Sequence, residues 1–274
     1  MIKNETISNI KLKIVVKGAG EVASAVANKL KFSGFQVCLT EIPIPLSIHR
    51  GTSYSEVIWA KEKTVEGIAA RYISSPNEVY KAWKDDRIAV IIDPDANIKD
   101  FINPDVFIDA TMEKVKNFST KITDAPLVIG LGPGFYAGRD VNLVVETNNS
   151  DKISKVILEG EAEPYIPIPL EVGGYTYERV IRNSKEGIFH VIRDMGEIVK
   201  KGEKVAWIDD EELKSNIDGV IRAIMRDGIF VKINTKLGEI DPRPDPELCN
   251  IIRPRMRVIA GGVLEAIMYW YNRK

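Results

Sequence analysis

Short runs of apolar, β-branched residues alternate with segments of helical spacing over the first 150 residues. The runs fall at 12–16, 36–40, 88–92, 106–108, 127–129 and 141–145. A run that is apolar at every position is typical of a strand buried on both faces. After the first run, apolar residues recur at helical spacing from Val22 to Leu30. This pattern predicts a Rossmann-like α/β domain over residues 1–150, with a mostly parallel sheet.

A glycine turn joins the first predicted strand to the first predicted helix. Gly18, Gly20 and Ala23 follow the strand as G-x-G-x-x-A. In this motif the first glycine allows a tight turn, the second lets the backbone approach a pyrophosphate, and the third position lets the helix pack closely. Glu41 ends the second strand 21 residues after Gly20, where an acid would hold a ribose hydroxyl. The turn predicts a bound nucleotide, and a packing turn without a ligand is the alternative.

Acidic residues and glycines follow directly after most of the predicted strands. They are Gly18, Gly20, Glu41, Asp93, Asp109, Gly132, Gly134 and Glu146. These positions share the carboxyl edge of an open parallel sheet, where ligands bind, although acids and glycines also end strands that have no ligand. The glycines of residues 130–135, with Arg139 nearby, predict either an anion-binding nest or a structural turn.

The sequence changes character near residue 150, which predicts a second domain over 151–274. Residues 187–208 and 219–240 align without a gap at a spacing of 32 residues, and each half contains short strands punctuated by glycine. This repeat resembles the biotinyl/lipoyl type of barrel-sandwich domain. Lys214, between the halves, lacks the setting of a carrier lysine, so the repeat predicts a structural or docking module. The tail predicts a C-terminal helix from about Gly262.

Composition limits the possible partners. The net charge of −1 gives no general attraction to nucleic acid or to anionic lipid. Cys38 and Cys249 cannot form a disulfide framework, no apolar run approaches a membrane span, and residues 1–13 lack the apolar core of a signal peptide. These features predict a cytoplasmic protein that binds neither nucleic acid nor membrane, and they leave a homo-oligomer open.

The sequence offers few residues for acid–base chemistry or metal binding. His49 and Arg50 lie in the long connection after the second strand, where they could contact phosphate, and His49 could act as an acid or base. An ordinary loop role is the alternative for both. The two histidines and two separated cysteines match no usual metal-ligand spacing, so no metal site is expected.

Several strings along the chain have no generic structural cause. They are VVKGAGEVASAVA, TEIPIPLSIHRGTSYSEV, FIDATM, VIGLGPGFYAGRDVNLVVETN, EGEAEP, GEIDPR and AGGVLEAI. In these strings the sequence resembles the family of selenium-dependent molybdenum hydroxylase accessory proteins. The resemblance implies a factor that assists maturation of a molybdenum hydroxylase of the xanthine dehydrogenase type. It supplies a pathway and a partner, the hydroxylase or its cofactor-insertion machinery, but no catalytic residues.

Three functions are therefore expected, in decreasing order. The first is a maturation factor that binds a nucleotide or a nucleotide-bearing cofactor at the Gly18–Gly20 turn, such as a nicotinamide dinucleotide or a molybdopterin nucleotide. The second is a non-enzymatic adaptor that docks the hydroxylase. The third is an NAD(P)-dependent oxidoreductase, for which no convincing catalytic set is visible. The sequence does not decide whether the protein is an enzyme.

Overall fold

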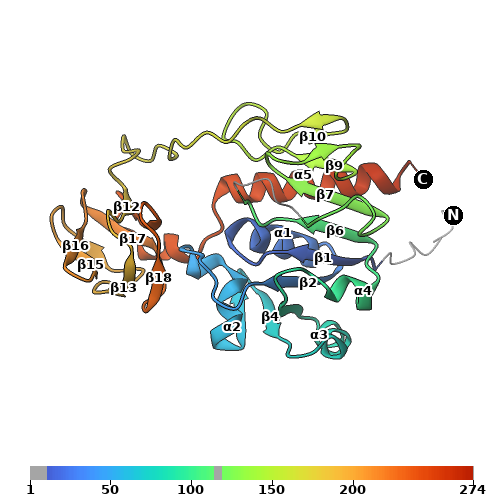
Figure 1. Ribbon diagram of the computed structural model, residues 1–274, viewed down its shortest axis with the longest axis horizontal. Coiled ribbons are helices and arrows are strands. Elements are labelled where there is room, and N and C mark those ends of the chain that lie inside the picture. The colour runs from blue at the N-terminus through green and yellow to red at the C-terminus, as the bar shows by residue number, and fades with distance from the viewer. Residues whose placement is uncertain (1–10, 114–118, 274) are drawn as a thin grey trace, which may run out of the picture.

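Two lobes make up the computed structural model, which describes residues 11–113 and 119–273. Figure 1 shows a large sheet with helices on both faces, and a smaller lobe of strands at the left of the view. We call the two sheets of the smaller lobe the C-terminal sheets. None of the described helices has the length and hydropathy needed to cross a bilayer.

The large sheet has nine strands in the order β10-β9-β7-β6-β1-β2-β5-β4-β3. Its strands are β1 (Lys13–Lys17), β2 (Gln36–Glu41), β3 (Glu62–Val65), β4 (Ile68–Tyr72), β5 (Ile88–Ile92), β6 (Val106–Asp109), β7 (Leu127–Leu131), β9 (Leu143–Val145) and β10 (Val156–Ile157). Neighbours from β9 to β4 run parallel, whereas β3 and β10 pair antiparallel with β4 and β9 at the two edges. The short pair β8 (Tyr136–Ala137) and β11 (Gly160–Glu161) lies outside this sheet.

Helices cover both faces of the large sheet because its strands are apolar on both faces. On one face, α1 (Glu21–Phe32), α2 (Val57–Ala60) and α5 (Pro254–Tyr271) pack over alternate strand residues such as Ile14 and Val16. On the other face, α3 (Val79–Lys84) and α4 (Ile98–Ile102) pack over residues such as Val15 and Phe107. Helix α5 runs beside α1 (Figure 1).

The C-terminal sheets each have four antiparallel strands, in the orders β12-β19-β17-β14 and β16-β15-β13-β18. The strands are β12 (Val180–Arg182), β13 (Gly187–Val191), β14 (Ile198–Val199), β15 (Lys204–Ile208), β16 (Glu211–Lys214), β17 (Gly219–Ile224), β18 (Ile229–Val231) and β19 (Lys236–Asp241). Each half of the sequence repeat supplies three strands, and the middle strand of each half joins the sheet of the other half. Ile48, from the connection after β2, completes their shared core.

The predicted fold class, a Rossmann-like domain followed by a barrel-sandwich domain, is wrong. The large sheet is mixed, with antiparallel strands at both edges, and the second region is a pair of separate antiparallel sheets. Residues 64–73 alternate weakly between apolar and polar positions, a pattern typical of a single strand. They form the end of one strand and the whole of another, because Glu66 and Gly67 take positive φ angles of 45° and 80° and reverse the chain.

The C-terminal helix also differs from the prediction. It begins at Pro254 instead of near Gly262, and it packs against α1 of the large sheet. Proline is well suited to the first helical position, where its missing N–H costs nothing. Position 262 requires glycine because a Cβ there would come within 2.4 Å of the Ser154 carbonyl oxygen, whereas a Cβ on Gly261 would meet nothing within 4 Å. Gly262 therefore marks a close approach of two segments inside the helix and not the start of the helix.

Candidate functional site

The Gly18–Gly20 turn leaves the start of α1 open. The Gly18 N–H donates to the Thr40 carbonyl at 2.9 Å, and Gly18 has a φ of +98°, which favours glycine. Gly20 precedes the first residue of α1, and no side chain caps this helix. A Cβ on Gly20 would meet nothing within 4 Å. The turn therefore presents free helix N–H groups to an open space, as an anion-binding site requires.

Glu41 lies against the same turn, as predicted for an acid at the end of β2. Its Oε2 accepts a hydrogen bond from the Ala19 N–H at 3.0 Å, and its Oε1 accepts one from the Ile42 N–H at 2.8 Å. Burial raises the pKa of this carboxyl, and the two backbone donors lower it in part. Glu41 thus holds the glycine turn in shape at the place predicted for a ribose contact. Ala23 is fully buried in the core under α1, which matches its predicted packing role.

Asp109 is the last residue of β6, and hydroxyl groups of its own edge hold its side chain. Its Oδ1 accepts from the Thr111 hydroxyl at 2.7 Å, and its Oδ2 accepts from the Thr120 hydroxyl at 2.5 Å. Lys17, its register partner on β1, donates to the Ser119 hydroxyl at 2.9 Å. The buried Asp109 side chain therefore shapes this edge through polar contacts within the protein.

The second glycine turn, Gly132–Gly134, is packed instead of open. Gly132 has a φ of +75°, and a Cβ there would come within 2.5 Å of the Thr147 hydroxyl oxygen. Arg139 pairs with Asp140 and lies over the Tyr136 ring, so its charge is neutralised locally. A shallow cavity of about 530 Å³ lies beside this turn and includes Gly134, Arg139 and Asp140 in its lining.

Glu146, Asp93 and Arg50 have local structural partners. Glu146 is buried, and its carboxylate accepts from the backbone N–H groups of Thr147, Asn148 and Glu163 at 2.6–2.7 Å. Asp93 accepts from the Ile98 N–H at 2.7 Å, at the start of α4. Arg50 donates to the Ile224 carbonyl at 2.9 Å and pairs with Asp194, so it ties its loop to the C-terminal sheets.

His49 lies in a buried cluster of charges between the two lobes. We call Glu21, His49, Arg179, Glu239 and Arg253 the joint cluster. His49 is 8% exposed; its Nε2 lies 3.7 Å from Glu21 Oε2 and 3.7 Å from Glu239 Oε2, and it has no hydrogen-bond partner among the described residues. Arg253 donates from Nε to Glu21 Oε1 at 2.6 Å and from Nη1 to Glu239 Oε2 at 3.2 Å.

The charged residues of the joint cluster shift one another's pKa values. Burial lowers the pKa of His49, although the facing Glu21 carboxylate opposes this effect. Burial alone would raise the pKa values of Glu21 and Glu239, but His49 and Arg253 outweigh it and hold both below their ordinary range. Both carboxylates are therefore ionised near neutral pH, with Arg253 as their shared cation.

Metal binding has no support in the described part of the chain. Over residues 11–113 and 119–273, no group of three or more His, Cys, Asp or Glu side chains is arranged to hold a metal ion. In the joint cluster, the guanidinium of Arg253 contacts both carboxylates and occupies the role that a cation would have.

The structure brings some of the predicted residues together and separates others. Gly18, Gly20 and Glu41 share one site, and His49 lies beside it through Glu21. The sequence interpretation missed Glu239, Arg253 and Arg255, which arrive from the distant β19 and α5. One local signal was available: Arg253 and Arg255 flank Pro254 at the start of a helix, where cations oppose the helix dipole.

The chain was compared with known proteins. No family model matches it. It is 36% identical over 255 residues to the uncharacterized protein YqeB of Escherichia coli strain K12, a match that covers 93% of this chain and 47% of YqeB. The chain therefore spans about half the length of this curated relative.

Three solved structures are similar at low identity. The product-bound ectoine utilization protein EutE (DoeB) from Ruegeria pomeroyi is 10% identical, with a TM-score of 0.25 and coverage of 84% of this chain and 85% of that one. A succinylglutamate desuccinylase from Silicibacter sp. TM1040 is 14% identical, with a TM-score of 0.25 and coverage of 84% of each chain. An aspartoacylase family protein from Mesorhizobium loti is 11% identical, with a TM-score of 0.27 and coverage of 83% and 84%. TM-scores and identities this low support no conclusion about the fold or function of this chain.

Proposed function

We propose that this protein is an accessory factor in the maturation of a selenium-dependent molybdenum hydroxylase, and that it holds a nucleotide or nucleotide-bearing cofactor at the Gly18–Gly20 turn. The observation that supports a bound nucleotide is the uncapped start of α1, with open space at the Cβ position of Gly20. Free N–H groups and the helix dipole favour a phosphate there. Glu41 lies against the turn and suits a contact to a sugar hydroxyl.

The pathway rests on the resemblance of the sequence strings, and the structure adds where those strings lie. Their residues include the first glycine turn, Asp109 at the end of β6, the second glycine turn after β7, and Glu239 of the joint cluster. These positions meet at the carboxyl edge of the large sheet and at the joint beside it. The strings that contribute residues to this edge support a shared site for a ligand and a partner, while others lie elsewhere, such as residues 260–267 inside α5. A nicotinamide dinucleotide and a molybdopterin nucleotide both fit the chemistry of this turn.

A docking role alone, without a ligand, is the second candidate function. The pentapeptide Ile-Pro-Ile-Pro-Leu occurs twice, at residues 42–46 and 166–170, and all six of its aliphatic residues are exposed, by 38–61%. Proline fixes such a segment in an extended form, so it loses little conformational freedom when it binds a partner. No observation favours the third candidate, an oxidoreductase, because His49 is buried between two carboxylates at the joint.

The test of the proposed function is a deletion in a host that makes such a hydroxylase. The deletion strain should contain the hydroxylase polypeptide in an inactive form, and the wild-type gene should restore its activity. Mass spectrometry of the natively purified protein should find a nucleotide or a pterin nucleotide. Fully active hydroxylase in the deletion strain would overturn the maturation function. A complementing Gly20→Val variant would favour the docking role without a ligand.

A further inference from the structure

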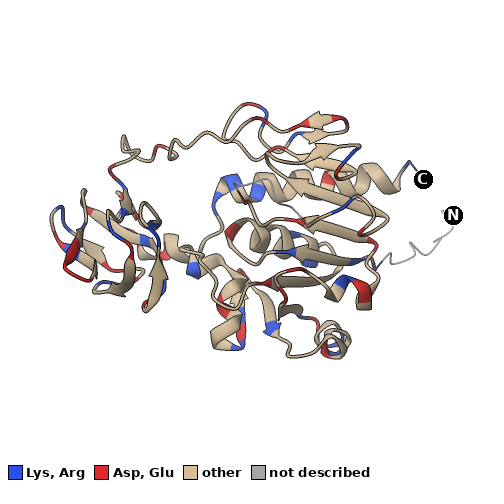
Figure 2. Ribbon diagram, in the orientation of Figure 1, with Lys and Arg blue, Asp and Glu red and all other residues tan. Residues whose placement is uncertain are grey.

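Two helices begin side by side at the edge of the large sheet. Helices α1 and α5 contact each other along their length, and Arg253 at the start of α5 forms an ion pair with Glu21 at the start of α1. Neither helix has a side chain that caps its first turn. Figure 2 shows the basic start of α5 beside the acidic start of α1, both facing the C-terminal sheets. The open N-terminus of α1 and its dipole therefore point at this corner, whereas at the start of α5 Pro254 has no N–H and the Met256 N–H donates to the Arg253 carbonyl at 2.9 Å.

Arg255 is the cation of this corner that has no acidic partner in the described chain. Its Nη2 donates to the Thr147 carbonyl at 2.6 Å, while its Nε is buried without a hydrogen-bond partner. Burial, with the nearby positive charge of Arg253, lowers the pKa of Arg255. In contrast, Arg253 pairs with Glu21 and Glu239, and Arg257 pairs with Glu66. A partly buried cation without an acid is costly, and it also opposes the dipole of its own helix.

The position of Arg255 links the two glycine turns. Thr147, whose carbonyl it contacts, also faces Gly132 of the second turn. Glu21, at the start of α1, is among the charges that act on it. His49 Nε2 lies 3.7 Å from both Glu21 and Glu239, so the imidazole faces two carboxylates of the chain and not a free anion. The donor at this corner that lacks an acceptor is therefore the buried Nε of Arg255, and a guanidinium recognises an anion.

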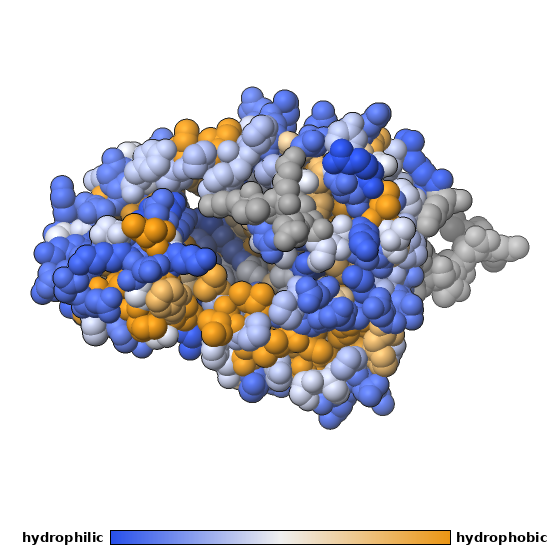
Figure 3. Space-filling view, viewed as in Figure 1, coloured by the Kyte–Doolittle hydropathy of each residue, from blue (hydrophilic) through white to orange (hydrophobic). Residues whose placement is uncertain are grey.

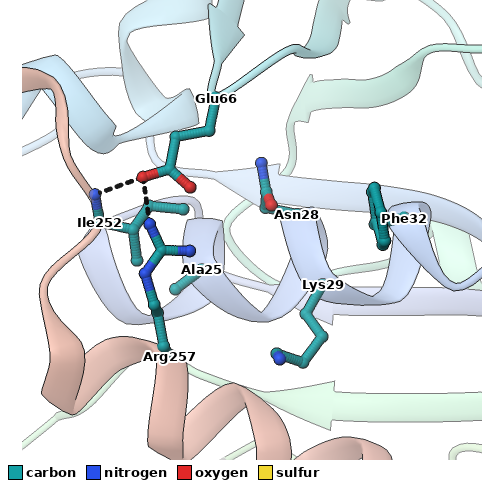
Figure 4. Close-up of a pocket in the computed structure, with 7 residues that line it drawn as sticks. All are labelled: Ala25, Asn28, Lys29, Phe32, Glu66, Ile252 and Arg257. Atoms are coloured by element: carbon teal, nitrogen blue, oxygen red, sulfur yellow. Dashed lines mark hydrogen bonds and ion pairs between the residues drawn. The ribbon is translucent and has the colours of Figure 1, made fainter.

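In two other cavities, the arginine of the lining is paired with an acidic residue. The cavity in Figure 4 has about 290 Å³ and lies between α1, the β3–β4 turn and the start of α5. Figure 4 shows Glu66 in contact with both the Ile252 N–H and Arg257, so that arginine is neutralised. In the cavity beside the second glycine turn, Arg139 is neutralised by Asp140. Arg257 therefore provides a matched control for Arg255, on the same helix and with the same chemistry.

We propose that Arg255 and the first turn of α1 form a phosphate-binding site, and that the ligand at the Gly18–Gly20 turn carries a diphosphate. This inference rests on the proposed function for the presence of a ligand. It deepens that function by naming a diphosphate as the charged group of the ligand. A diphosphate placed at Gly20 accepts hydrogen bonds from N–H groups of α1 and from the guanidinium of Arg255. Its negative charge neutralises the unpaired charge of Arg255. Glu21 does not repel it strongly, because Arg253 already neutralises that carboxylate.

The experiment measures binding of inorganic pyrophosphate and of ADP to the full chain by isothermal titration calorimetry at low salt. The variant Arg255→Met should weaken binding of both probes by about tenfold or more, because it removes a charge-assisted hydrogen bond donor. The control Arg257→Met should bind as the wild type does. Arg255→Lys keeps the charge, so it should recover part of the affinity. Circular dichroism melting curves should establish that each variant is folded before titration.

Two outcomes would overturn the site. One is an Arg255→Met variant, shown to be folded, that binds pyrophosphate as tightly as the wild type. The other is a wild-type protein that binds neither pyrophosphate nor ADP at millimolar concentration. The proposed function fails separately: active hydroxylase in the deletion strain removes the pathway while Arg255-dependent binding still stands. Conversely, if Gly20→Val loses binding while Arg255→Met binds fully, a ligand still binds at the Gly18–Gly20 turn but Arg255 is not part of its site.

Discussion

The two glycine turns of the large sheet present the same sequence signal with opposite physical causes. At the first turn, a Cβ on Gly20 would meet nothing, and the helix behind it is uncapped. At the second turn, a Cβ on Gly132 would strike the Thr147 hydroxyl. The first turn keeps space for something outside the chain, whereas at Gly132 the second turn is filled by the chain itself and only its Gly134 side borders a cavity. The comparison teaches that glycine at a sheet edge indicates a ligand only where its missing side chain leaves open space.

The largest expected effect comes from a side chain at the second turn. The variant Gly132→Ala should lower the free energy of unfolding by about 2–3 kcal/mol, because it combines a left-handed backbone with a steric contact. The control is Gly138→Ala, which also has a positive φ, of +83°, but meets nothing within 4 Å. It should cost about 1–2 kcal/mol, from backbone strain alone. Equal losses in urea denaturation would show that Thr147 moves aside, and that the second turn is open too.

The next effect concerns the acid that holds the segment after the second turn. Glu146→Gln should cost about 1.5–3 kcal/mol, because the buried carboxylate accepts three backbone N–H groups and an amide cannot. Glu186→Gln, at an exposed position, serves as the control and should change stability by less than about 0.5 kcal/mol. Urea denaturation of both variants tests this. A negligible change in Glu146→Gln would remove the structural role assigned to this carboxylate.

A smaller effect should appear in the pH dependence of stability, through His49 beside the first turn. Burial lowers its pKa in the folded protein below the ordinary value of 6.5, so the unfolded chain binds the proton more readily. Stability should therefore fall as pH drops below about 6.5, by at most about 1.4 kcal/mol per pH unit. Glu21 and Glu239 have lowered pKa values, so their contribution is lost only below their ordinary value of 4.5.

The window between pH 4.5 and 6.5 thus isolates His49 from the two carboxylates that face it. Denaturation across this window should show a slope in the wild type that the His49→Gln variant reduces. An identical slope in wild type and His49→Gln would mean that the imidazole is solvated in the folded protein, contrary to its burial.

The smallest stability change should come from the first turn, together with a loss of binding. Gly20→Val should alter the free energy of unfolding by about 1 kcal/mol or less, because the position precedes the helix and has open space around it. Its affinity for pyrophosphate should nevertheless fall below detection, since the side chain occupies the path of the phosphate. Gly20→Ala should lose less affinity than Gly20→Val. If both variants keep wild-type affinity, the first turn serves packing only.

Local features of the fold were readable from the sequence, and long-range ones were not. The apolar runs predicted the central strands, and the G-x-G-x-x-A spacing predicted the turn at Gly18 and the burial of Ala23, because strand burial and turn geometry depend on neighbouring residues. The mixed character of the large sheet escaped prediction because it depends on how edge strands pair. Arg253 and Glu21 are 232 positions apart, and no local pattern reports that they meet.

The contact between the first and last helices constrains how the chain folds. Helix α5 supplies Met256, Ala260 and Val263 to the same core that contains Ala23 and Leu30 of α1. During synthesis the part of this face over β7, β9 and β10 stays uncovered until about 230 further residues have followed α1. Contacts of such long sequence separation slow folding and expose apolar surface to aggregation. The strands of the C-terminal sheets lie close together in the sequence. These sheets can therefore fold before α5 has packed onto the large sheet.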